Sequence, residues 1–216
     1  MASLVNPIAP IETLADFLGQ LGDIDPARVR FRPAPGTATE QDVLDIHARE
    51  GRLCELVEHA LVEKVMGFRE SWLASVLIQA LLNFVKPRDL GLVTGEAGLI
   101  ELASGLIRIP DVAFIAWERL PGRRLPQEPI PAIAPNLVVE VLSQANTARE
   151  MERKRREYCE AGVQLVWLVH PETRTVEVCT ASDQSSLLHE GDILDGGVVL
   201  PGFVLSLNEL FLELNR

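Results

Sequence analysis

The sequence predicts an α/β fold in which helices flank a mixed central β-sheet. Two apolar runs, NLVVEVLS (136–143) and QLVWLV (164–169), are typical of strands that are covered on both faces. A helical segment at 147–161 lies between them, so the three elements form a βαβ unit whose strands are expected to be parallel. A long segment at 70–86, with apolar residues at helical spacing, predicts a second helix. These observations indicate a mixed α/β protein.

The chain is long enough for one domain with a full hydrophobic core. Of its 216 residues, 47% are hydrophobic and 24% are charged, which excludes disordered and fibrous classes. The formal net charge of −11 weakens a nucleic-acid interpretation, because Lys and Arg supply most non-specific affinity for phosphates. An aromatic share of 5% argues against a surface that stacks single-stranded bases. Acidic residues that bind cations would contribute to this charge.

The N-terminal sequence and the cysteines favour a soluble, cytoplasmic protein. MASLVNPIAPIETLADFLGQ lacks a basic segment followed by a continuous apolar run, so no signal peptide is expected. No stretch reaches the roughly 18 apolar residues that span a bilayer. Cys54, Cys159 and Cys179 form no C-x-x-C pair. We therefore expect free thiols in a reducing compartment, and neither a zinc site nor a disulfide framework.

Two regions are predicted along the chain, with residues 1–40 as an N-terminal extension and linker and residues 41–216 as the folded domain. Within the first region, 12–22 is compatible with a short amphipathic helix. The segment RFRPAPGTATEQD that follows contains the Pro and Gly residues typical of a linker. Residues 40–50 predict a helical turn or two.

From residue 52 onward, the other elements are predicted by local periodicity and turn residues. RLCELV and ALVEKV alternate apolar and polar residues and predict a hairpin. The remaining expected elements, in chain order, are a strand–turn–strand segment at 91–102, a strand-like segment at 106–117 interrupted by Pro110, a loop at 118–136, an outer strand in HPETRTVEVCTA, a turn at GDILDGG and a C-terminal helix in LSLNELFLEL.

Two carboxylates are candidates for a metal site. Glu140 lies within LVVEVL, where its neighbours predict burial on both faces, and a buried carboxylate costs several kcal/mol unless it is paired or binds a cation. A core salt bridge or a wet edge strand would also accommodate it. Asp111, which follows Pro110, could by itself belong to a simple turn. On adjacent strands, however, Asp111 and Glu140 could share Mg²⁺ or Mn²⁺, which prefer hard oxygen ligands.

A basic residue is expected near these carboxylates on the helix at 147–161. A capping box starts the helix near Thr147. The strand advances about 10 Å from Glu140 to Ser143, and the helix returns about 10 Å from Thr147 to Lys154. Lys154 is therefore expected level with Glu140, where a cation can hold the attacking water or stabilise phosphate charge. By helical angle Arg155 faces the sheet at least as directly. Since basic residues on such helices are usually solvated, pattern alone leaves both open.

Four motifs, IPDVAFIAW, LVVEVLS, KxxxY and AGVxxVWLVxP, follow one another in this order. Together they resemble the Uma-two family of restriction-endonuclease-like proteins, which are similar in fold to the PD-(D/E)XK nucleases. The resemblance covers about residues 50–180. It implies a restriction-endonuclease-like core, metal-dependent hydrolysis of phosphodiester bonds and DNA as a partner. A homodimer would bring two sites to the two strands.

The resemblance also implies roles for individual residues. Asp111 and Glu140 match the two acidic metal ligands of the motif. The standard lysine position, two residues after the second acid, is Leu142 in this chain. The resemblance therefore implies that the catalytic lysine has moved to the following helix, to Lys154, and this favours Lys154 over Arg155.

Three further residues are accessory candidates, and two positions depart from the family pattern. Glu55 matches an early acidic position, Tyr158 completes the KxxxY match, and Glu96 lies in a Gly turn as an outside candidate. His59 stands where relatives usually carry glycine in the hairpin turn. Glu70-Ser71-Trp72 replaces the usual histidine at the start of the long helix. Both departures concern the rim of the predicted site.

The candidate residues favour one function, while the composition favours another. The complete Asp–Glu–Lys set favours a Mg²⁺-dependent DNA endonuclease, in which Asp111 and Glu140 hold the ion and Lys154 positions the attacking water. The acidic charge and the sparse aromatics favour a nuclease-like fold retained as a binding or regulatory module with little or no catalysis. A metal-dependent hydrolase acting on RNA or small nucleotides is a third hypothesis.

Overall fold

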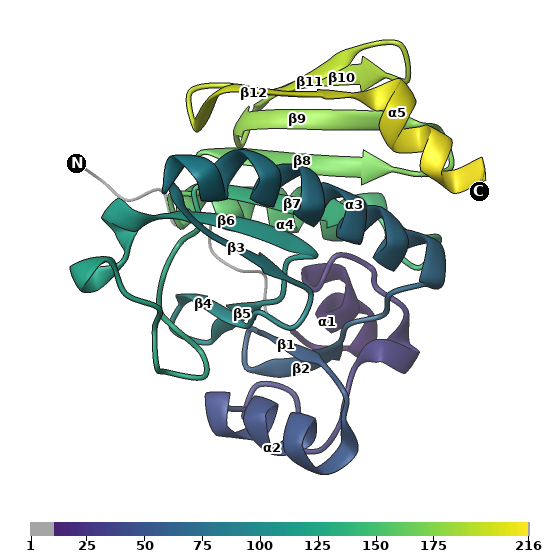
Figure 1. Cartoon of the computed structure of the whole chain (residues 1–216). Coiled ribbons are helices and arrows are strands. Elements are labelled where there is room, and N and C mark those ends of the chain that lie inside the picture. Colours follow the sequence, from purple (N-terminus) through teal and green to yellow (C-terminus); the bar gives the residue numbers. More distant parts are fainter. Residues whose placement is uncertain (1–10, 216) are drawn as a thin grey trace, which may run out of the picture.

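In the computed structural model, which describes residues 11–215, a six-stranded sheet forms the centre of the fold (Figure 1). The strand order is β10-β9-β8-β7-β6-β3. β7 and β8 run parallel, as predicted for the βαβ unit, and the other neighbours are antiparallel. The strands are β3 (Gly91–Gly95), β6 (Val112–Ala116), β7 (Leu137–Val141), β8 (Leu165–His170), β9 (Thr175–Ala181) and β10 (Gln184–His189).

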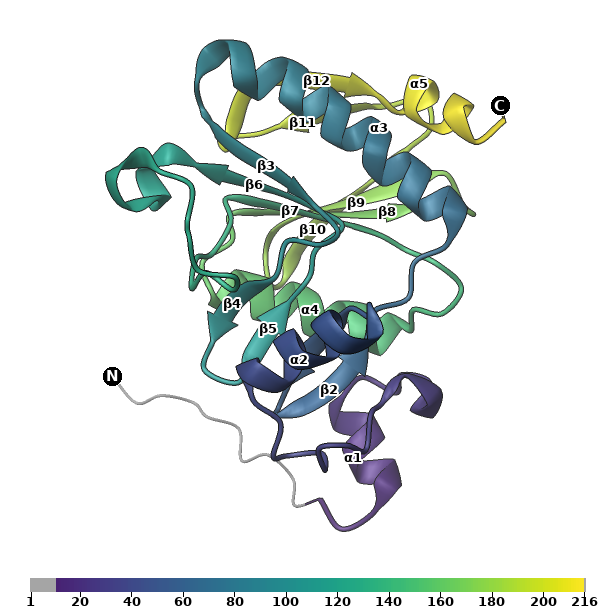
Figure 2. The same ribbon diagram turned by 60° about the horizontal axis from the view of Figure 1, so that its bottom comes forward.

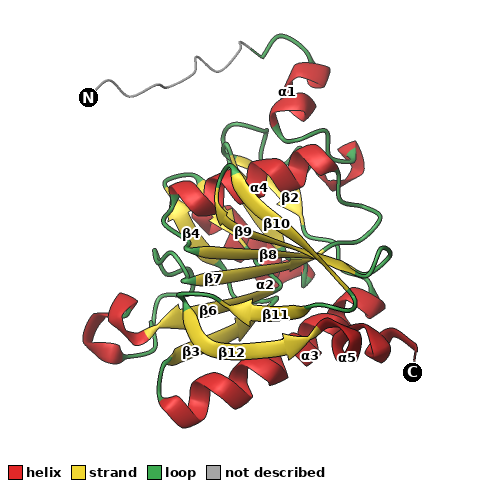
Figure 3. Cartoon of the chain, turned by 90° about the horizontal axis from the view of Figure 1, so that it is seen from above, coloured by secondary structure: helices red, strands yellow, loops and turns green. Residues whose placement is uncertain are grey.

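The sheet lies between two helices (Figures 2 and 3). Alternate residues of its strands belong to the core beneath one helix or the other. α3 (Phe68–Val85) packs on one face, and α4 (Ala148–Glu160) on the other. Val139 of β7 belongs to the core beneath α3, whereas Val138 belongs to the core beneath α4. Because side chains alternate along a strand, Glu140 faces α4. The predicted mixed α/β fold with flanking helices is thus confirmed.

Both flanking helices form for local reasons that the sequence contains. In α3, Leu73, Leu77 and Leu81 are buried and recur every fourth residue, which keeps them on one face. α4 begins after Thr147, whose hydroxyl accepts a hydrogen bond from the Glu150 backbone N–H at 3.0 Å. Among the described residues, no helix is both long and apolar enough to cross a membrane.

A smaller antiparallel sheet, in the order β2-β1-β5-β4, lies beside the central one (Figure 1). Its strands are β1 (Cys54–Val57), β2 (Ala60–Glu63), β4 (Ile100–Ala103) and β5 (Leu106–Arg108). α2 (Glu40–Glu50) packs on this sheet through Val43 and Ile46. The predicted hairpin is the β1–β2 pair.

The chain passes between the two sheets three times, first from β2 to β3 through α3, and the third passage carries Asp111. β3 belongs to the central sheet and β4 to the small one; β5 belongs to the small sheet and β6 to the central one. The predicted strands at 91–102 and 106–117 therefore form, but each segment is divided between sheets. Pro110 and Asp111 lie between β5 and β6, so the candidate site is at the junction of the sheets.

The C-terminal part differs from the prediction. GDILDGG is not a simple turn, because Ile193–Gly196 form β11, which pairs with β12 (Leu200–Ser206). LSLNELFLEL is helical only from Leu207, where α5 (Leu207–Leu212) starts after the last residues of β12. β10 was not predicted, since its mostly exposed sequence QSSLLH lacks an alternating pattern. It forms by backbone pairing with β9 at the sheet edge.

The described residues ahead of α2 pack against the rest of the molecule. α1 (Leu14–Gln20) contributes Phe17 to a core cluster that also contains Val62 of β2. Arg28 forms a buried ion pair with Glu150 of α4 at 2.8 Å. The segment predicted as an extension and linker thus contacts both the small sheet and α4. The division of the chain at residue 40 stays a prediction.

Candidate active site

Strand register brings Asp111 next to Glu140. β6 and β7 are antiparallel with Val112 opposite Val139, so the residue before Val112 is level with the residue after Val139. The backbone N–H of Val141 donates a hydrogen bond to Asp111 Oδ2 at 2.6 Å. The two carboxylates are 3% and 5% exposed. They therefore share one buried position beneath α4.

Two donors from α4 hold the Glu140 carboxylate. The Tyr158 hydroxyl donates to Glu140 Oε1 at 2.5 Å, and Lys154 Nζ donates to the same oxygen at 3.2 Å. Burial raises the pKa of Glu140 above its ordinary value, and the charges of Lys154 and Lys64 offset this only in part. Tyr158 thus orients Glu140, while Lys154 supplies a positive charge beside it.

Lys154 lies between two carboxylates. Its Nζ is 3.2 Å from Glu140 Oε1 and 3.1 Å from Glu55 Oε1. Burial alone would lower the pKa of Lys154, but these two carboxylates raise it above the ordinary value. Lys154 therefore remains an ammonium and cannot serve as a base. Arg155, the other basic candidate, pairs instead with Glu177 at 3.0 Å.

Glu55 is fully buried and contacts the same Lys154 ammonium as Glu140. Its Oε2 accepts a hydrogen bond from Arg108 Nη1 at 2.6 Å, and its Oε1 accepts one from the Ile109 backbone N–H at 3.2 Å. Arg108 also donates through Nε to Glu157 Oε2 at 2.9 Å. Although burial would raise the pKa of Glu55, Lys154 and Arg108 hold it well below its usual range. The Glu55 carboxylate is thus an ionised anchor for Lys154.

A second lysine, which the sequence interpretation did not single out, contacts Asp111. Lys64 directly follows β2, and its Nζ lies 2.6 Å from Asp111 Oδ1. The same ammonium donates to the backbone carbonyl of Ile109. Lys64, Asp111, Glu140 and Lys154 all line one cavity of about 20 Å³. Two lysines and two carboxylates therefore meet at this position.

Glu96 lies apart from this group. It lines a different cavity, of about 350 Å³, together with Ser71 and Asp111. Over residues 11–215, the structure records no hydrogen bond or ion pair that joins Glu96 to Glu140 or Lys154. Glu96 thus shares a cavity with Asp111 and with residues near the start of α3. One of these, Ser71, is part of one of the two departures from the family pattern.

The other departure, His59, occupies a strained turn. Glu58 and His59 connect β1 to β2 with φ of 50° and 55°, which is the left-handed region that favours glycine. The His59 ring compensates by a contact of 3.1 Å between Nδ1 and the Ala38 carbonyl. The substitution thus changes the outer end of the hairpin and leaves Lys64, at its other end, in contact with Asp111.

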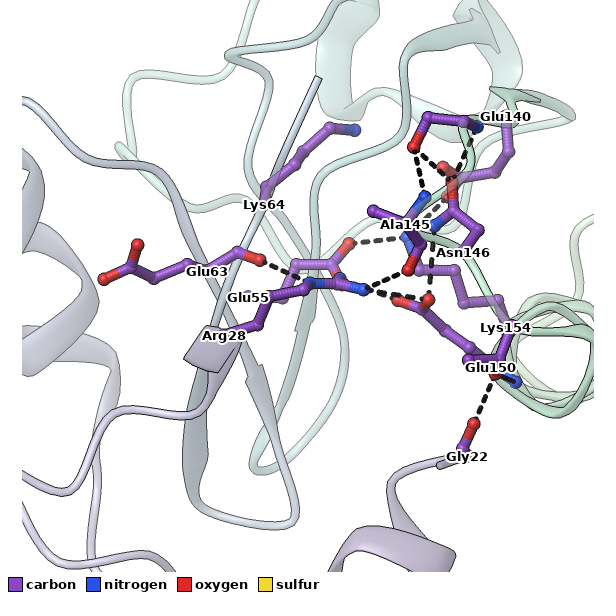
Figure 4. Close-up of polar contacts among 12 residues, drawn as sticks. Gly22, Arg28, Glu55, Glu63, Lys64, Glu140, Ala145, Asn146, Glu150 and Lys154 are labelled. Carbon is purple, nitrogen blue, oxygen red and sulfur yellow. Dashed lines mark hydrogen bonds and ion pairs between the residues drawn. The ribbon is translucent and has the colours of Figure 1, made fainter. Parts of the chain in front are cut away.

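An arginine from the N-terminal segment completes the surroundings of the site. Figure 4 shows Arg28 between Glu63 and Glu150. Its Nε donates to the Glu63 carbonyl at 3.1 Å, while Nη1 and Nη2 donate to the two carboxylate oxygens of Glu150 at 3.0 and 2.8 Å. Asn146 also donates to Glu150 at 3.2 Å. Arg28 thus connects β2 to the first turn of α4, one turn before Lys154.

The oxygen atoms at Asp111 suit a divalent cation. Among the described residues, no group of three His, Cys, Asp or Glu side chains could hold a metal ion. Nevertheless, Asp111 Oδ1 and the Ile109 carbonyl already contact one cation, the Lys64 ammonium. Such oxygens are hard ligands, and Mg²⁺ binds through one or two carboxylates while keeping several waters. Asp111, Ile109 and Glu140 therefore fit a hydrated Mg²⁺ or Mn²⁺ provided that Lys64 moves away.

Three charged residues at or near the site were missed by the sequence interpretation. Arg28 lies in the segment predicted as a linker, and nothing local links it to Glu150. Lys64 and Arg108 had a usable signal, because each lies in a segment predicted as a strand, Lys64 in ALVEKV and Arg108 in LIRIPDVAFIAW. In the structure Lys64 directly follows β2 and Arg108 is the last residue of β5. A positive charge at the buried end of a strand requires a carboxylate partner, and Asp111 and Glu55 are those partners.

Comparisons with known proteins show the fold and the family of the chain. One solved structure, a crystal structure from Anabaena variabilis described as "a putative nuclease", has a TM-score of 0.67 and 22% sequence identity. The match covers 75% of this chain and 91% of the other, and it shows a shared fold. No curated protein matches the chain. Residues 40–208 match the Uma2 family, whose description is "Putative restriction endonuclease". The match covers most of the chain and includes Asp111, Glu140 and Lys154, so the protein belongs to the Uma2 family.

Proposed function

We propose that the protein is a Mg²⁺- or Mn²⁺-dependent endonuclease that hydrolyses phosphodiester bonds in DNA. Asp111 and Glu140 would hold the ion, and Lys154 would be the catalytic cation. The observation that carries this proposal is the position of the Lys154 ammonium, buried and 3.2 Å from Glu140, at the point where Asp111 enters β6. Membership of the Uma2 family supports a nuclease-like function.

Each residue has a task that follows from its contacts. Bound at Asp111 and Glu140, the ion would supply positive charge that stabilises the departing oxygen and favours ionisation of water. Lys154 stays protonated between Glu140 and Glu55, so it can donate hydrogen bonds to the attacking water or to a phosphate oxygen. Tyr158 holds the Glu140 carboxylate through its hydroxyl and keeps it directed toward Lys154.

DNA as the substrate and a homodimer as the active form belong to the same proposal. A duplex presents two equivalent strands, and a twofold dimer presents two equivalent sites. The net charge of −11 predicts weak affinity at physiological salt. RNA and small nucleotides are therefore the alternative substrates. The free cysteines Cys54, Cys159 and Cys179 support a reducing compartment such as the cytoplasm.

One observation favours the second candidate function, a nuclease-like fold that binds without catalysis. Lys64 neutralises Asp111 directly, as a basic residue would in a site that had lost its metal. The burial of Asp111 and Glu140 side by side argues against this interpretation, because a binding module has no need to bear the cost of burying two adjacent carboxylates.

Replacing Lys154 by Met is expected to lower Mg²⁺-dependent cleavage by about 10²-fold or more, since a fixed charge at the reacting phosphate is lost. The matched control is Arg155→Met, which removes a positive charge from the adjacent residue of the same helix, where it pairs with Glu177. Initial rates on plasmid DNA, single-stranded oligonucleotides and RNA measure both. A Lys154→Met rate close to that of Arg155→Met would remove Lys154 from the mechanism.

A further inference from the structure

Lys64 holds the oxygen atoms that a metal ion would need. Its Nζ contacts Asp111 Oδ1 at 2.6 Å and donates to the Ile109 carbonyl. A carboxylate and a backbone carbonyl that converge on one positive charge are the ligand types that Mg²⁺ and Mn²⁺ use. The Lys64 side chain is 8% exposed, so this contact is part of the buried site and not a chance surface pair.

There is no room for a second cation while Lys64 stays in place. The cavity that Lys64, Asp111, Glu140 and Lys154 line measures about 20 Å³, enough for about one water molecule. A divalent ion that keeps several waters needs more space. Two cations would also repel each other strongly at the same Asp111 oxygen.

The location of Lys64 allows it to leave. Lys64 is the first residue after β2, and its positive charge is carried on a flexible four-carbon stem. Val65, the next residue, is exposed and lines the same cavity. Figure 4 shows Lys64 and Arg28 approaching the site from one side, opposite Glu140 and Lys154. Hydrogen bonds to Glu150 and Glu63 fix Arg28. By contrast, a divalent ion could replace the Lys64 ammonium at Asp111 and at the Ile109 carbonyl.

We propose that Lys64 is a tethered cation that competes with the divalent metal for Asp111 and Ile109 and thereby sets the metal affinity of the site. In the metal-free protein the ammonium neutralises Asp111. When a divalent ion binds, Lys64 withdraws toward the cavity mouth beside Val65, where it is available to a phosphate oxygen of the substrate. This inference rests on the proposed function, because it concerns the ion at the proposed catalytic site.

The test is isothermal titration of the full-length native protein and of Lys64→Met with MnCl2, without nucleic acid. Methionine is unbranched, one atom shorter than lysine and uncharged, so Mn²⁺ should bind Lys64→Met at least about tenfold more tightly. Lys86→Met is the matched control, because the exposed Lys86 is the one lysine of the chain outside the site, and it should bind Mn²⁺ like the native protein. Combining Lys64→Met with Asp111→Asn should abolish the gain.

A dissociation constant for Lys64→Met equal to or weaker than the native value overturns the competition. Thermal unfolding verifies that the variant folds, and Lys64→Gln, which stays polar, is expected to show the same gain if Lys64→Met does not fold. Cleavage assays separate the two proposals. Tighter Mn²⁺ binding without cleavage by any variant would support the competition and contradict the nuclease. Mg²⁺-dependent cleavage by the native protein, without tighter Mn²⁺ binding by Lys64→Met, would support the nuclease and contradict the competition. Absence of Mn²⁺ binding in all variants would contradict both proposals.

Discussion

Glu140→Gln is expected to lower metal-dependent cleavage on the order of a thousandfold while leaving the protein folded. The substitution removes one of the two carboxylate charges that would hold the ion and the charge that faces Lys154. Folding should persist, because Gln keeps an oxygen that can accept from Tyr158, and Lys154 retains Glu55 at 3.1 Å. Single-turnover rates on a labelled DNA duplex, at saturating Mg²⁺, measure the loss.

The matched control is Glu177→Gln. Glu177 is also a carboxylate on a strand of the central sheet and also pairs with a basic residue of α4, Arg155, at 3.0 Å. Its substitution should leave the rate within about threefold of the native value, because it lies outside the site. If Glu140→Gln retained more than a tenth of native cleavage, Glu140 would have no role at the reacting phosphate.

The second large effect is expected on stability. Arg108→Met should lower the free energy of unfolding by about 3–5 kcal/mol, because it removes the one cation that two buried carboxylates share. Arg108 is 2% exposed and donates to Glu55 and Glu157. Burial works against the charged form, yet these carboxylates raise the pKa of Arg108 above its ordinary value. Urea unfolding at pH 7, followed by circular dichroism, measures the change.

An exposed arginine on the same helix as Glu157 provides the comparison. Arg149 pairs with Asp23 at 2.7 Å, and its side chain is 71% exposed. Solvent-exposed ion pairs contribute about 0–1 kcal/mol to stability. Arg149→Met should therefore lower the free energy of unfolding by at most about 1 kcal/mol. An Arg108→Met loss no larger than the Arg149→Met loss would mean that Lys154 and Arg153 alone compensate Glu55 and Glu157. The proposed role of Arg108 in holding Glu55 beneath Lys154 would then be wrong.

The sequence is sufficient to predict where the two carboxylates lie. A charged residue inside a strand buried on both faces is costly, and that cost singles out Glu140 among the residues of its strand. Asp111 can be placed beside it because the strand that follows Asp111 is expected to neighbour the strand of Glu140. The register of β6 and β7 agrees with this placement. The catalytic roles of both residues remain proposals.

Lys154 shows the limit of periodicity. Adjacent helical residues differ in direction by about 100°, so Lys154 and Arg155 can lie on either side of the direction that faces the sheet. An approximate helix orientation therefore cannot show which of the two points toward Glu140. The family resemblance favours Lys154. In the structure, Glu55 lies beneath Lys154 at 3.1 Å and Glu177 lies beside Arg155 at 3.0 Å. The choice thus depends on partners in β1 and β9, which local pattern does not reveal.

The contacts of Arg28 and Lys64, and the C-terminal strands, could not be inferred for a related reason. Arg28 and Glu150 are 122 positions apart in the chain, and Lys64 and Ile109 are 45 apart. Only the packing of the N-terminal segment and the small sheet against α4 brings such residues together. β10 gives no pattern because its side chains are mostly exposed, so its backbone pairing with β9 alone makes it a strand.

Metal dependence of phosphodiester cleavage by the purified native protein tests the central claim most directly. The protein is treated with EDTA, dialysed, and incubated with plasmid DNA and with labelled duplex before and after addition of Mg²⁺ or Mn²⁺. We expect no cleavage without the ion and cleavage once it is restored, since Asp111 and Glu140 would hold it. Cleavage that persists in EDTA, or folded protein that cleaves neither DNA nor RNA with either ion, would contradict the proposed function.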